Sequence, residues 1–186
     1  MTLPQLETTR LRLEHFAPKN AAALLEYYAR NREYLVPWEP ARPEAFYVLE
    51  AQLRESERAV EAALRGSAYR FVAFERDSEY VVAYVSLHEI RRGIAQDAIV
   101  GYSVDELRQG RGYATEAVGA VVRFAFESLN LHRIRTSYQP PNAASGRVLE
   151  KLGFVREGYA REELFINGAW QDGVLVAMVN PRWSAP

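Results

Sequence analysis

Two glycines separated by one residue, Gly110 and Gly112, lie in a polar loop between a short apolar strand, 99–104, and an amphipathic helix. Backbone N–H groups in such a loop can crowd around an anion, because glycine has no side chain to keep the anion away. The N-terminus of the following helix adds partial positive charge, and Arg108 and Arg111 add full charges that can pair with phosphate. The spacing predicts a pyrophosphate-binding loop, with a loop that merely turns the chain as the alternative.

Two other kinds of phosphate loop are excluded by the residues after the second glycine. A P-loop needs Lys followed by Ser or Thr at this point, whereas Tyr113 and Ala114 stand there. The dinucleotide-binding fingerprint needs a third glycine three positions later, and that position holds Thr115. What remains is the six-residue sequence QGRGYA at 109–114.

Other residue types that transfer groups or bind metals are scarce. The chain has no cysteine, which excludes disulfides, thiolate metal sites and a cysteine nucleophile. The three histidines, His15, His88 and His132, are far apart in the sequence. No pair of them has metal-ligand spacing, so we expect no metal.

The composition predicts one folded domain, 1–186, because 186 residues with 48% hydrophobic content can bury a full core. A net charge of −1 argues against a surface for direct nucleic-acid binding. The absence of an apolar run of about 18 or more residues predicts no membrane span. The N-terminal sequence MTLPQLETTR lacks the apolar core of a signal peptide, so we expect a cytoplasmic protein.

Hydrophobic periodicity predicts the elements that position these residues: a strand, two helices, three strands, the glycine loop with its helix, a strand, a short helix and a hairpin. The strands are expected at 9–16, 69–75, 81–87, 98–104, 133–138, 159–166 and 170–179, and the helices from Pro18, at 43–65, from 113 to 129 and at 143–152. The second and third strands look buried on both faces. In the helix 43–65 the apolar stripe is Phe46, Leu49, Leu53, Val60 and Leu64.

The segment 31–42 is expected to be irregular, because Pro37 and Pro40 forbid a regular helix. Two large aromatic residues, Tyr34 and Trp38, lie in this segment. They either pack onto the core or form a wall of a substrate cleft, which makes them the candidate substrate-binding residues.

Three local motifs resemble the GNAT superfamily of N-acetyltransferases. The sequence at 109–114 fits its acetyl-CoA loop, Q/R-x-x-G-x-G/A. The other two motifs are Asn142-x-x-Ser145 followed by LEKLGF, and a closing Asn167-Gly168 hairpin. The resemblance implies acetyl-CoA as co-substrate. It also implies a mixed α/β (α+β) fold, with a central mixed β-sheet that is splayed at its centre and has helices on both faces.

Further motifs, spread over nearly the whole chain, resemble the ribosomal-protein-alanine N-acetyltransferases of the RimJ type. They are YYARNR at 27–32, PWEP at 37–40, GYS at 101–103, LHRI at 131–134, GYA at 158–160 and DGVL at 172–175. This resemblance implies that the acceptor is the N-terminal alanine of a ribosomal protein. The expected partners are acetyl-CoA and that N-terminus, and the protein is expected as a monomer or homodimer.

The same resemblance assigns the CoA-binding residues. The loop should hold the CoA pyrophosphate through the backbone of Gln109, Gly110, Arg111, Gly112, Tyr113 and Ala114. The strand edge at Tyr102, Ser103 and Val104 should pair with the pantetheine arm, at a bulge that splays the sheet. Asn142 and Ser145 should lie near the thiol. Asn142 could instead be only a helix cap, and the Ser145 hydroxyl either stabilises the departing thiolate or is idle.

The general base is assigned by position. Without a cysteine, we favour direct attack of the amine on bound acetyl-CoA in a ternary complex. Related enzymes use a glutamate on the penultimate strand, at a position that falls on Leu164. The neighbour Glu163 is the candidate base, beside Glu162, because a shift of one residue reverses the face of a strand. His88 and Glu89 are the alternatives.

Proton affinity favours an N-terminal acceptor. An α-amino group, with a pKa of about 7.8, is roughly one third neutral at pH 7.5, whereas lysine, at about 10.4, is neutral in about one molecule in a thousand. Two other functions remain open. One is acetylation of a small amine such as a polyamine, amino acid or drug, which for a polyamine needs carboxylates such as Glu39, Glu44 and Glu89 to converge. The other is a ribosome-assembly factor that binds CoA without turnover.

Overall fold

The computed structural model describes residues 3–185, so residues 1, 2 and 186 of the predicted domain lie outside it. Eight strands form one sheet in the order β1-β2-β3-β4-β5-β6-β8-β7, and all neighbours are antiparallel except β5 and β6. The strands are β1 (Gln5–Glu7), β2 (Leu11–His15), β3 (Tyr69–Glu75), β4 (Val81–Arg91), β5 (Asp97–Val104), β6 (Arg133–Tyr138), β7 (Val155–Ile166) and β8 (Ala169–Val179). The helices are α1 (Ala21–Arg30), α2 (Arg32–Leu35), α3 (Leu49–Leu64), α4 (Tyr113–Arg123) and α5 (Ala143–Leu152).

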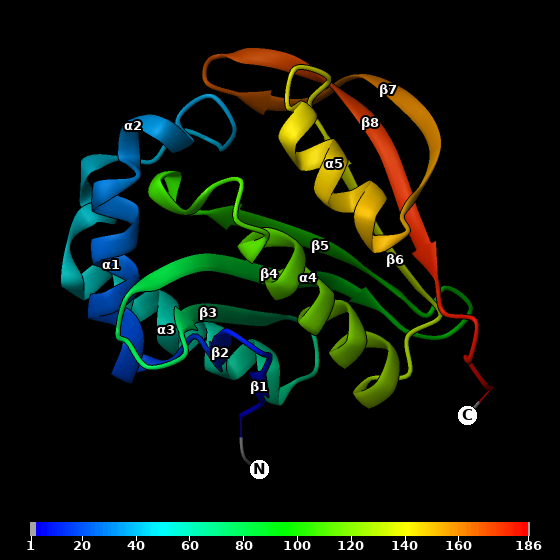
Figure 1. Ribbon diagram of the computed structural model, residues 1–186, viewed down its shortest axis with the longest axis horizontal. Helices are drawn as coiled ribbons and strands as arrows, with labels where there is room; N and C mark the ends of the chain where they lie inside the picture. The colour runs from blue at the N-terminus through cyan, green and yellow to red at the C-terminus, as the bar shows by residue number, and fades with distance from the viewer. Residues whose placement is uncertain (1–2, 186) are drawn as a thin grey trace.

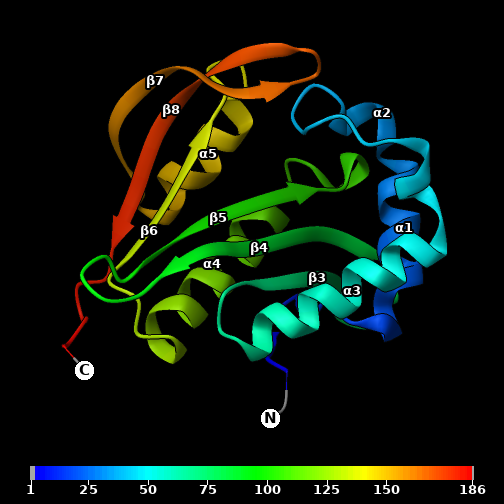
Figure 2. The same cartoon turned by 180° about the vertical axis from the view of Figure 1, so that it is seen from behind.

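Helices cover both faces of the sheet, as expected. Figure 1 shows α4 and α5 in front of the sheet, and Figure 2, from behind, shows α3 on the opposite face with α1 beside it. The α4 side buries Val85 and Leu87 of β4, whereas the other side buries Val72 and Phe74 of β3. Burial on both faces explains the near-continuous apolar sequences of these two strands and confirms that prediction.

The sheet is splayed between β5 and β6. The two strands pair only over Asp97–Ile99, after which β5 continues with β4 and β6 continues with β8. The expected bulge at residues 102–104 is wrong, because β5 pairs with β4 without interruption from Ile99 to Val104. The register shift lies instead on β4, between His88 and Arg91. In the described part of the chain, residues 3–185, the divergence itself leaves one edge of β5 without a strand partner beyond Ile99.

The segment 43–65 differs from its prediction. It is a short 3-10 turn at Glu44–Tyr47 followed by α3. The predicted apolar stripe is partly wrong, because Leu49 and Leu64 are 41% and 54% exposed. The buried face consists of smaller or polar residues, namely Gln52, Ser56, Ala59 and Ala63. These side chains let α3 approach its neighbours closely, and Gln52 satisfies its amide by donating to the Phe46 carbonyl at 2.8 Å.

The other differences are local. The strand β1 was not predicted, and β7 begins four residues before its predicted start at 159. The segment 31–42 contains the single-turn helix α2, which ends two residues before Pro37. The helix after the glycine loop finishes in a π-helical turn, Phe124–Ser128. The Asn167-Gly168 turn is confirmed, with both residues at positive φ, as a two-residue hairpin loop requires.

Candidate active site

A cleft of about 850 Å³ runs through the splay and opens on both faces of the sheet. On the α4 and α5 side its lining includes Gly112 and Val148, and on the α1 side it includes Trp38 and Tyr84. Successive residues of a strand point to opposite faces, so Tyr84 and Ser86 share the α1 face, whereas Val85 packs in the α4 core. Two molecules that enter from opposite faces can therefore meet at the gap.

The glycine loop has the conformation that an anion-binding loop needs. Gly110 and Gly112 have φ values of +70° and +81°, and Gly112 directly precedes α4. A Cβ on Gly110 would find no atom within 4 Å, so that side of the backbone is open. Within residues 3–185, no hydrogen bond uses the N–H groups of Gly110 and Gly112. These groups and the first turn of α4 could together bind a phosphate or diphosphate.

Neither Arg108 nor Arg111 is placed as the sequence predicted for pairing with phosphate. Arg111 is exposed and does not line the cleft, in contrast to the other five loop residues. Arg108 lines the cleft, but its Nε donates to Glu75 at 3.0 Å. Burial alone would raise the pKa of Glu75, but hydrogen bonds from Arg108 and Tyr113 outweigh it and lower that pKa. Anion binding by the loop 109–114 would therefore depend on its backbone N–H groups more than on arginine side chains.

A clamp that sequence reasoning missed holds this loop. Arg10 donates through Nε to Glu116 of α4 at 2.7 Å and through a terminal nitrogen to the Arg111 carbonyl at 2.9 Å. Its guanidinium also lies 4.5 Å from the centre of the Tyr113 ring. Arg10 and Glu116 are 106 positions apart, and no local spacing signals such a contact.

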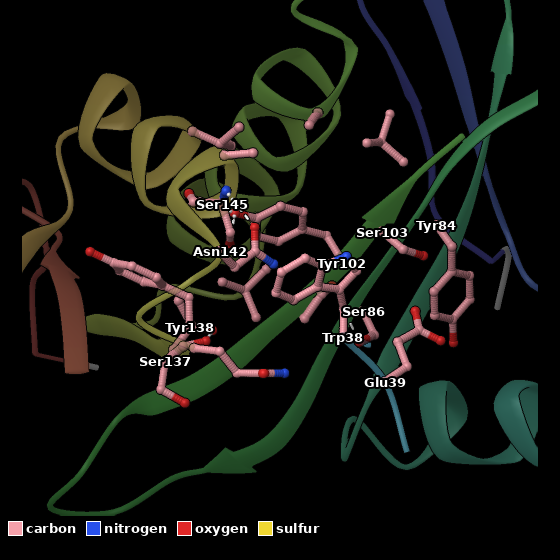
Figure 3. Close-up of a pocket in the computed structure, with 18 of the residues that line it drawn as sticks. Trp38, Glu39, Tyr84, Ser86, Tyr102, Ser103, Ser137, Tyr138, Asn142 and Ser145 are labelled. Carbon is pink, nitrogen blue, oxygen red and sulfur yellow. Dashed lines mark hydrogen bonds between the residues drawn. The ribbon is translucent and has the colours of Figure 1, made fainter. Parts of the chain in front are cut away.

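The edge of β5 faces the gap with two different side-chain environments. Ser103 is buried and accepts a hydrogen bond from the Tyr27 hydroxyl at 2.9 Å. Tyr102 points to the other face, where its hydroxyl lies 2.7 Å from the Ser145 Oγ (Figure 3). Burial raises the pKa of Tyr102 to about 12, with the hydrogen bond to Ser145 acting in the opposite direction. Tyr102, Ser103 and Val104 all line the cleft.

The first turn of α5 brings Asn142 and Ser145 to the cleft (Figure 3). Asn142 is the N-cap, since its Oδ1 accepts from the Ser145 N–H at 3.0 Å. Gly146 is needed in this turn, because a Cβ there would lie 2.9 Å from the Tyr138 ring. The capping role and a place in the cleft are therefore compatible for Asn142.

The loop after α1 forms the wall on the opposite side. Tyr34 and Trp38 are half-buried and line the cleft, and Tyr34 also packs against the α1 core. Gln139 of the loop after β6 donates to the Pro37 carbonyl at 3.2 Å, which connects the two sides of the cleft mouth. Tyr34 therefore both packs onto the core and forms part of the cleft wall, whereas Trp38 forms part of the cleft wall.

The candidate bases lie in distinct environments. Glu163, Leu164, His88 and Glu89 all line the cleft, whereas Glu162 is exposed outside it. Glu89 is paired with Arg135, and burial lowers the pKa of His88. The Oε2 atom of Glu163 is buried and has no hydrogen-bond partner within the described residues.

The carboxylates that a polyamine site would need do not form a free cluster. Glu39 and Glu89 line the cleft, but Glu39 is ion-paired with Arg42, and Glu89 with Arg135. Glu44 is exposed, pairs with Arg32 and does not line the cleft. Among residues 3–185, no group of three His, Cys, Asp or Glu side chains is placed to hold a metal ion. No helix in this range is long and apolar enough to cross a bilayer.

Comparisons with known proteins find similar sequences. Residues 10–155 match the family model of the acetyltransferase (GNAT) domain. The chain is 35% identical over 180 residues to the ribosomal protein uS5-alanine N-acetyltransferase of Escherichia coli (strain K12), covering 97% of this chain and 93% of the relative.

Solved structures show the same similarity. The ribosomal-protein-S5-alanine acetyltransferase from Vibrio fischeri superposes with a TM-score of 0.94 at 35% identity, covering 98% of this chain and 100% of that one. Mycobacterium smegmatis RimJ in complex with CoA-disulfide gives a TM-score of 0.87 at 26% identity, covering 95% of this chain and 86% of that one.

Proposed function

Because this chain belongs to the GNAT acetyltransferase family, we propose that it transfers the acetyl group of acetyl-CoA to the N-terminal alanine of a ribosomal protein. The observation that carries the proposal is the cleft that is lined from both faces of the sheet and passes through the splay. The similarity to a uS5-alanine N-acetyltransferase over 97% of the chain supports this acceptor. A ribosomal-protein acceptor places the reaction in the cytoplasm.

On the α4 and α5 side, the proposal assigns the loop 109–114 to the CoA diphosphate. The amide-rich pantetheine arm then pairs with the free edge of β5 at Tyr102, Ser103 and Val104. This path ends beside Asn142 and Ser145, where the helix N-terminus favours negative charge on sulfur.

The acceptor enters from the α1 side, past Tyr34 and Trp38. Its neutral amine attacks the thioester carbonyl, so an N–C bond forms and the C–S bond breaks with the electron pair going to sulfur. Glu163 accepts the surplus proton of the amine, and the hydrogen-bonded hydroxyls of Tyr102 and Ser145 stabilise the departing thiolate by hydrogen bonding, without losing their own protons. The thiolate is then protonated from solvent, and Glu163 releases its proton to solvent, so that no net proton is gained or lost. No cysteine is present to carry the acetyl group, which supports direct transfer.

The acceptor class follows from the same chemistry. An α-amine needs only a weak base near pH 7.5, whereas a lysine amine must first lose a tightly held proton. Acetylation of a small amine is the second candidate, but the pairing of Glu39, Glu44 and Glu89 with arginines disfavours a polyamine. An assembly factor without turnover would not need the Tyr102–Ser145 pair.

The test is to incubate the protein with labelled acetyl-CoA and a mixture of purified small-subunit ribosomal proteins, polyamines and free amino acids, and to map the label by mass spectrometry. The proposal expects one labelled protein with the acetyl group on its N-terminal residue. Label confined to small amines in the same mixture would reject it, and CoA binding without any label transfer would favour the assembly factor.

A further inference from the structure

The β7–β8 pair is interrupted at the cleft. Ala160 pairs with Gly173 and Leu164 pairs with Gln171, so residues 161–163 of β7 oppose the single residue Asp172 of β8. Glu162, in the middle of this bulge, has a φ of +50°. A bulge of this kind redirects the side chains next to it. Here Glu162 points to solvent, whereas Glu163 reaches the cleft.

Asp172 holds the bulge through both of its carboxylate oxygens. Its Oδ1 accepts a hydrogen bond from the Glu162 N–H at 2.8 Å, and its Oδ2 accepts one from the Tyr159 hydroxyl at 2.5 Å. These hydrogen bonds, from Tyr159 first and then from Glu162, lower the pKa of the Asp172 carboxyl, so the carboxylate stays charged and keeps both contacts. Asp172 thereby stabilises the left-handed backbone that a glutamate rarely adopts.

Gly173 supplies the space for the Glu163 side chain. A Cβ on Gly173 would overlap the Glu163 carboxylate, lying 2.8 Å from its Cδ, and would lie 3.3 Å from the Ser137 Cβ. The backbone of Gly173 is not left-handed, so a larger residue here meets no conformational barrier but requires the Glu163 carboxylate to move. In this place the Oε2 of Glu163 is buried without a hydrogen-bond partner in the described chain, which leaves it free to accept a hydrogen bond from a bound amine.

We infer that Asp172 and Gly173 are positioning residues for Glu163: Asp172 fixes the bulge that turns Glu163 toward the cleft, and Gly173 provides the volume that its carboxylate occupies. The inference rests on the proposed function, in which Glu163 accepts the proton of the acceptor amine. It accounts for the Glu163 side chain reaching the cleft from a stretch of β7 in which three residues oppose one residue of β8.

The test is a double-mutant cycle between Gly173→Ala and Glu163→Gln, assayed with a peptide that begins with Ala at saturating acetyl-CoA. Gly173→Ala should lower kcat by tenfold or more and leave the KM for acetyl-CoA within about twofold, because only the base is displaced. In the Glu163→Gln background, Gly173→Ala should have no further effect, since the group it displaces no longer acts. Gly158→Ala is the matched control, because Gly158 does not line the cleft and a Cβ there makes only an ordinary 3.5 Å contact with Leu175.

Asp172→Ala offers a second route if Gly173→Ala does not fold, since Asp172 is part of an exposed hydrogen-bond group. It should lower kcat in the wild-type background only, and Asp172→Asn should recover activity, because its amide oxygen can still accept from the Glu162 N–H. The inference would be overturned if Gly173→Ala or Asp172→Ala lowered kcat by the same factor in the Glu163→Gln background as in the wild type. It would also be overturned if neither variant changed kcat in the wild-type background. The wild-type assay separates the two claims: absence of N-terminal acetylation there rejects the proposed function and the inference with it, whereas wild-type activity combined with unaffected variants rejects the inference alone.

Discussion

The hydroxyl oxygens of Tyr102 and Ser145 lie 2.7 Å apart, although 43 positions separate the two residues in the chain. One comes from the free edge of β5 and the other from the first turn of α5, so the hydrogen bond spans the gap where the sheet is splayed. Because burial raises the pKa of Tyr102 to about 12, its hydroxyl stays protonated at neutral pH. The pair can therefore donate a hydrogen bond to a thiolate that forms beside it.

Ser145→Ala should lower kcat by roughly tenfold to a hundredfold with little change in the KM for acetyl-CoA, because the hydroxyl acts only as charge develops on sulfur. Tyr102→Phe should have a similar effect, and the double variant should be no worse than the stronger single one. Steady-state kinetics measure all three variants. A change confined to KM would make Ser145 a binding residue instead.

Gly112→Val should weaken acetyl-CoA binding by an order of magnitude or more, about 1.4 kcal/mol per decade. The substitution places a branched side chain at a φ of +81° and beside the anion cradle. Isothermal calorimetry measures the affinity. Gly66→Val is the matched control, because Gly66 has a φ of +67° with open space around it and lies outside the cleft. Equal affinity in the Gly112 variant and the wild type would refute the phosphate assignment.

The parts of the site that depend on local spacing were predictable from the sequence. Two glycines before a helix indicated a loop with exposed backbone, which the structure forms with Gly110 and Gly112 at positive φ, and Asn142 before a short helix indicated an N-cap. The supporting contacts were not predictable, because Arg10 reaches Glu116 across 106 positions. The prediction that Arg108 is free to pair with phosphate was wrong, because its side chain is paired with Glu75, and nothing near Arg108 in the sequence reveals that partner.

In the fold, too, features set by local sequence were predictable, whereas features set by packing and strand pairing were not. Strands buried on both faces were recognised from continuous apolar runs, and the hairpin from Asn167-Gly168. The buried side of α3 was not recognised, because periodicity weights large apolar residues, whereas close packing here uses Ser56 and Ala59. The splay at β5 and β6 depends on how far two parallel strands pair, which no single segment encodes.

Trp38→Ala should reduce kcat/KM for an N-terminal peptide by about tenfold, roughly 1.4 kcal/mol, and leave acetyl-CoA affinity unchanged. The reason is that Trp38 lines the cleft on the α1 side, away from the glycine loop. Val36→Ala is the control in the same loop, since Val36 is 45% exposed and does not line the cleft. Peptide kinetics and calorimetry together decide the outcome, and a loss of acetyl-CoA affinity in the Trp38 variant would contradict the assignment of this wall to the acceptor.

Stability should fall in acid partly through His15. Burial lowers the pKa of His15 from 6.5 to about 4, and its Nε2 accepts a hydrogen bond from the Arg70 N–H at 3.4 Å, which requires an unprotonated Nε2. Between about pH 6.5 and pH 4, His15 is therefore protonated in the unfolded chain but not in the native protein. The stabilising contribution of His15 to the free energy of unfolding is present above pH 6.5 and is lost as the pH falls. The loss is roughly 2 kcal/mol between pH 7 and pH 4.5.

Denaturant unfolding of the wild type and of His15→Gln at both pH values measures this contribution. The variant should lose less free energy of unfolding on acidification than the wild type does, because glutamine cannot be protonated. Parallel losses in the two proteins would show that His15 does not contribute.

The most direct measurement of the central claim uses one peptide that begins with Ala and contains a single internal lysine, incubated with acetyl-CoA and the wild-type protein. Fragmentation mass spectrometry locates the acetyl group. The account predicts acetylation at the N-terminal amine, an unmodified lysine, and no product from the same peptide with a formylated N-terminus. Acetylation mainly on the lysine, or faster turnover of free polyamines than of every peptide tested, would contradict it.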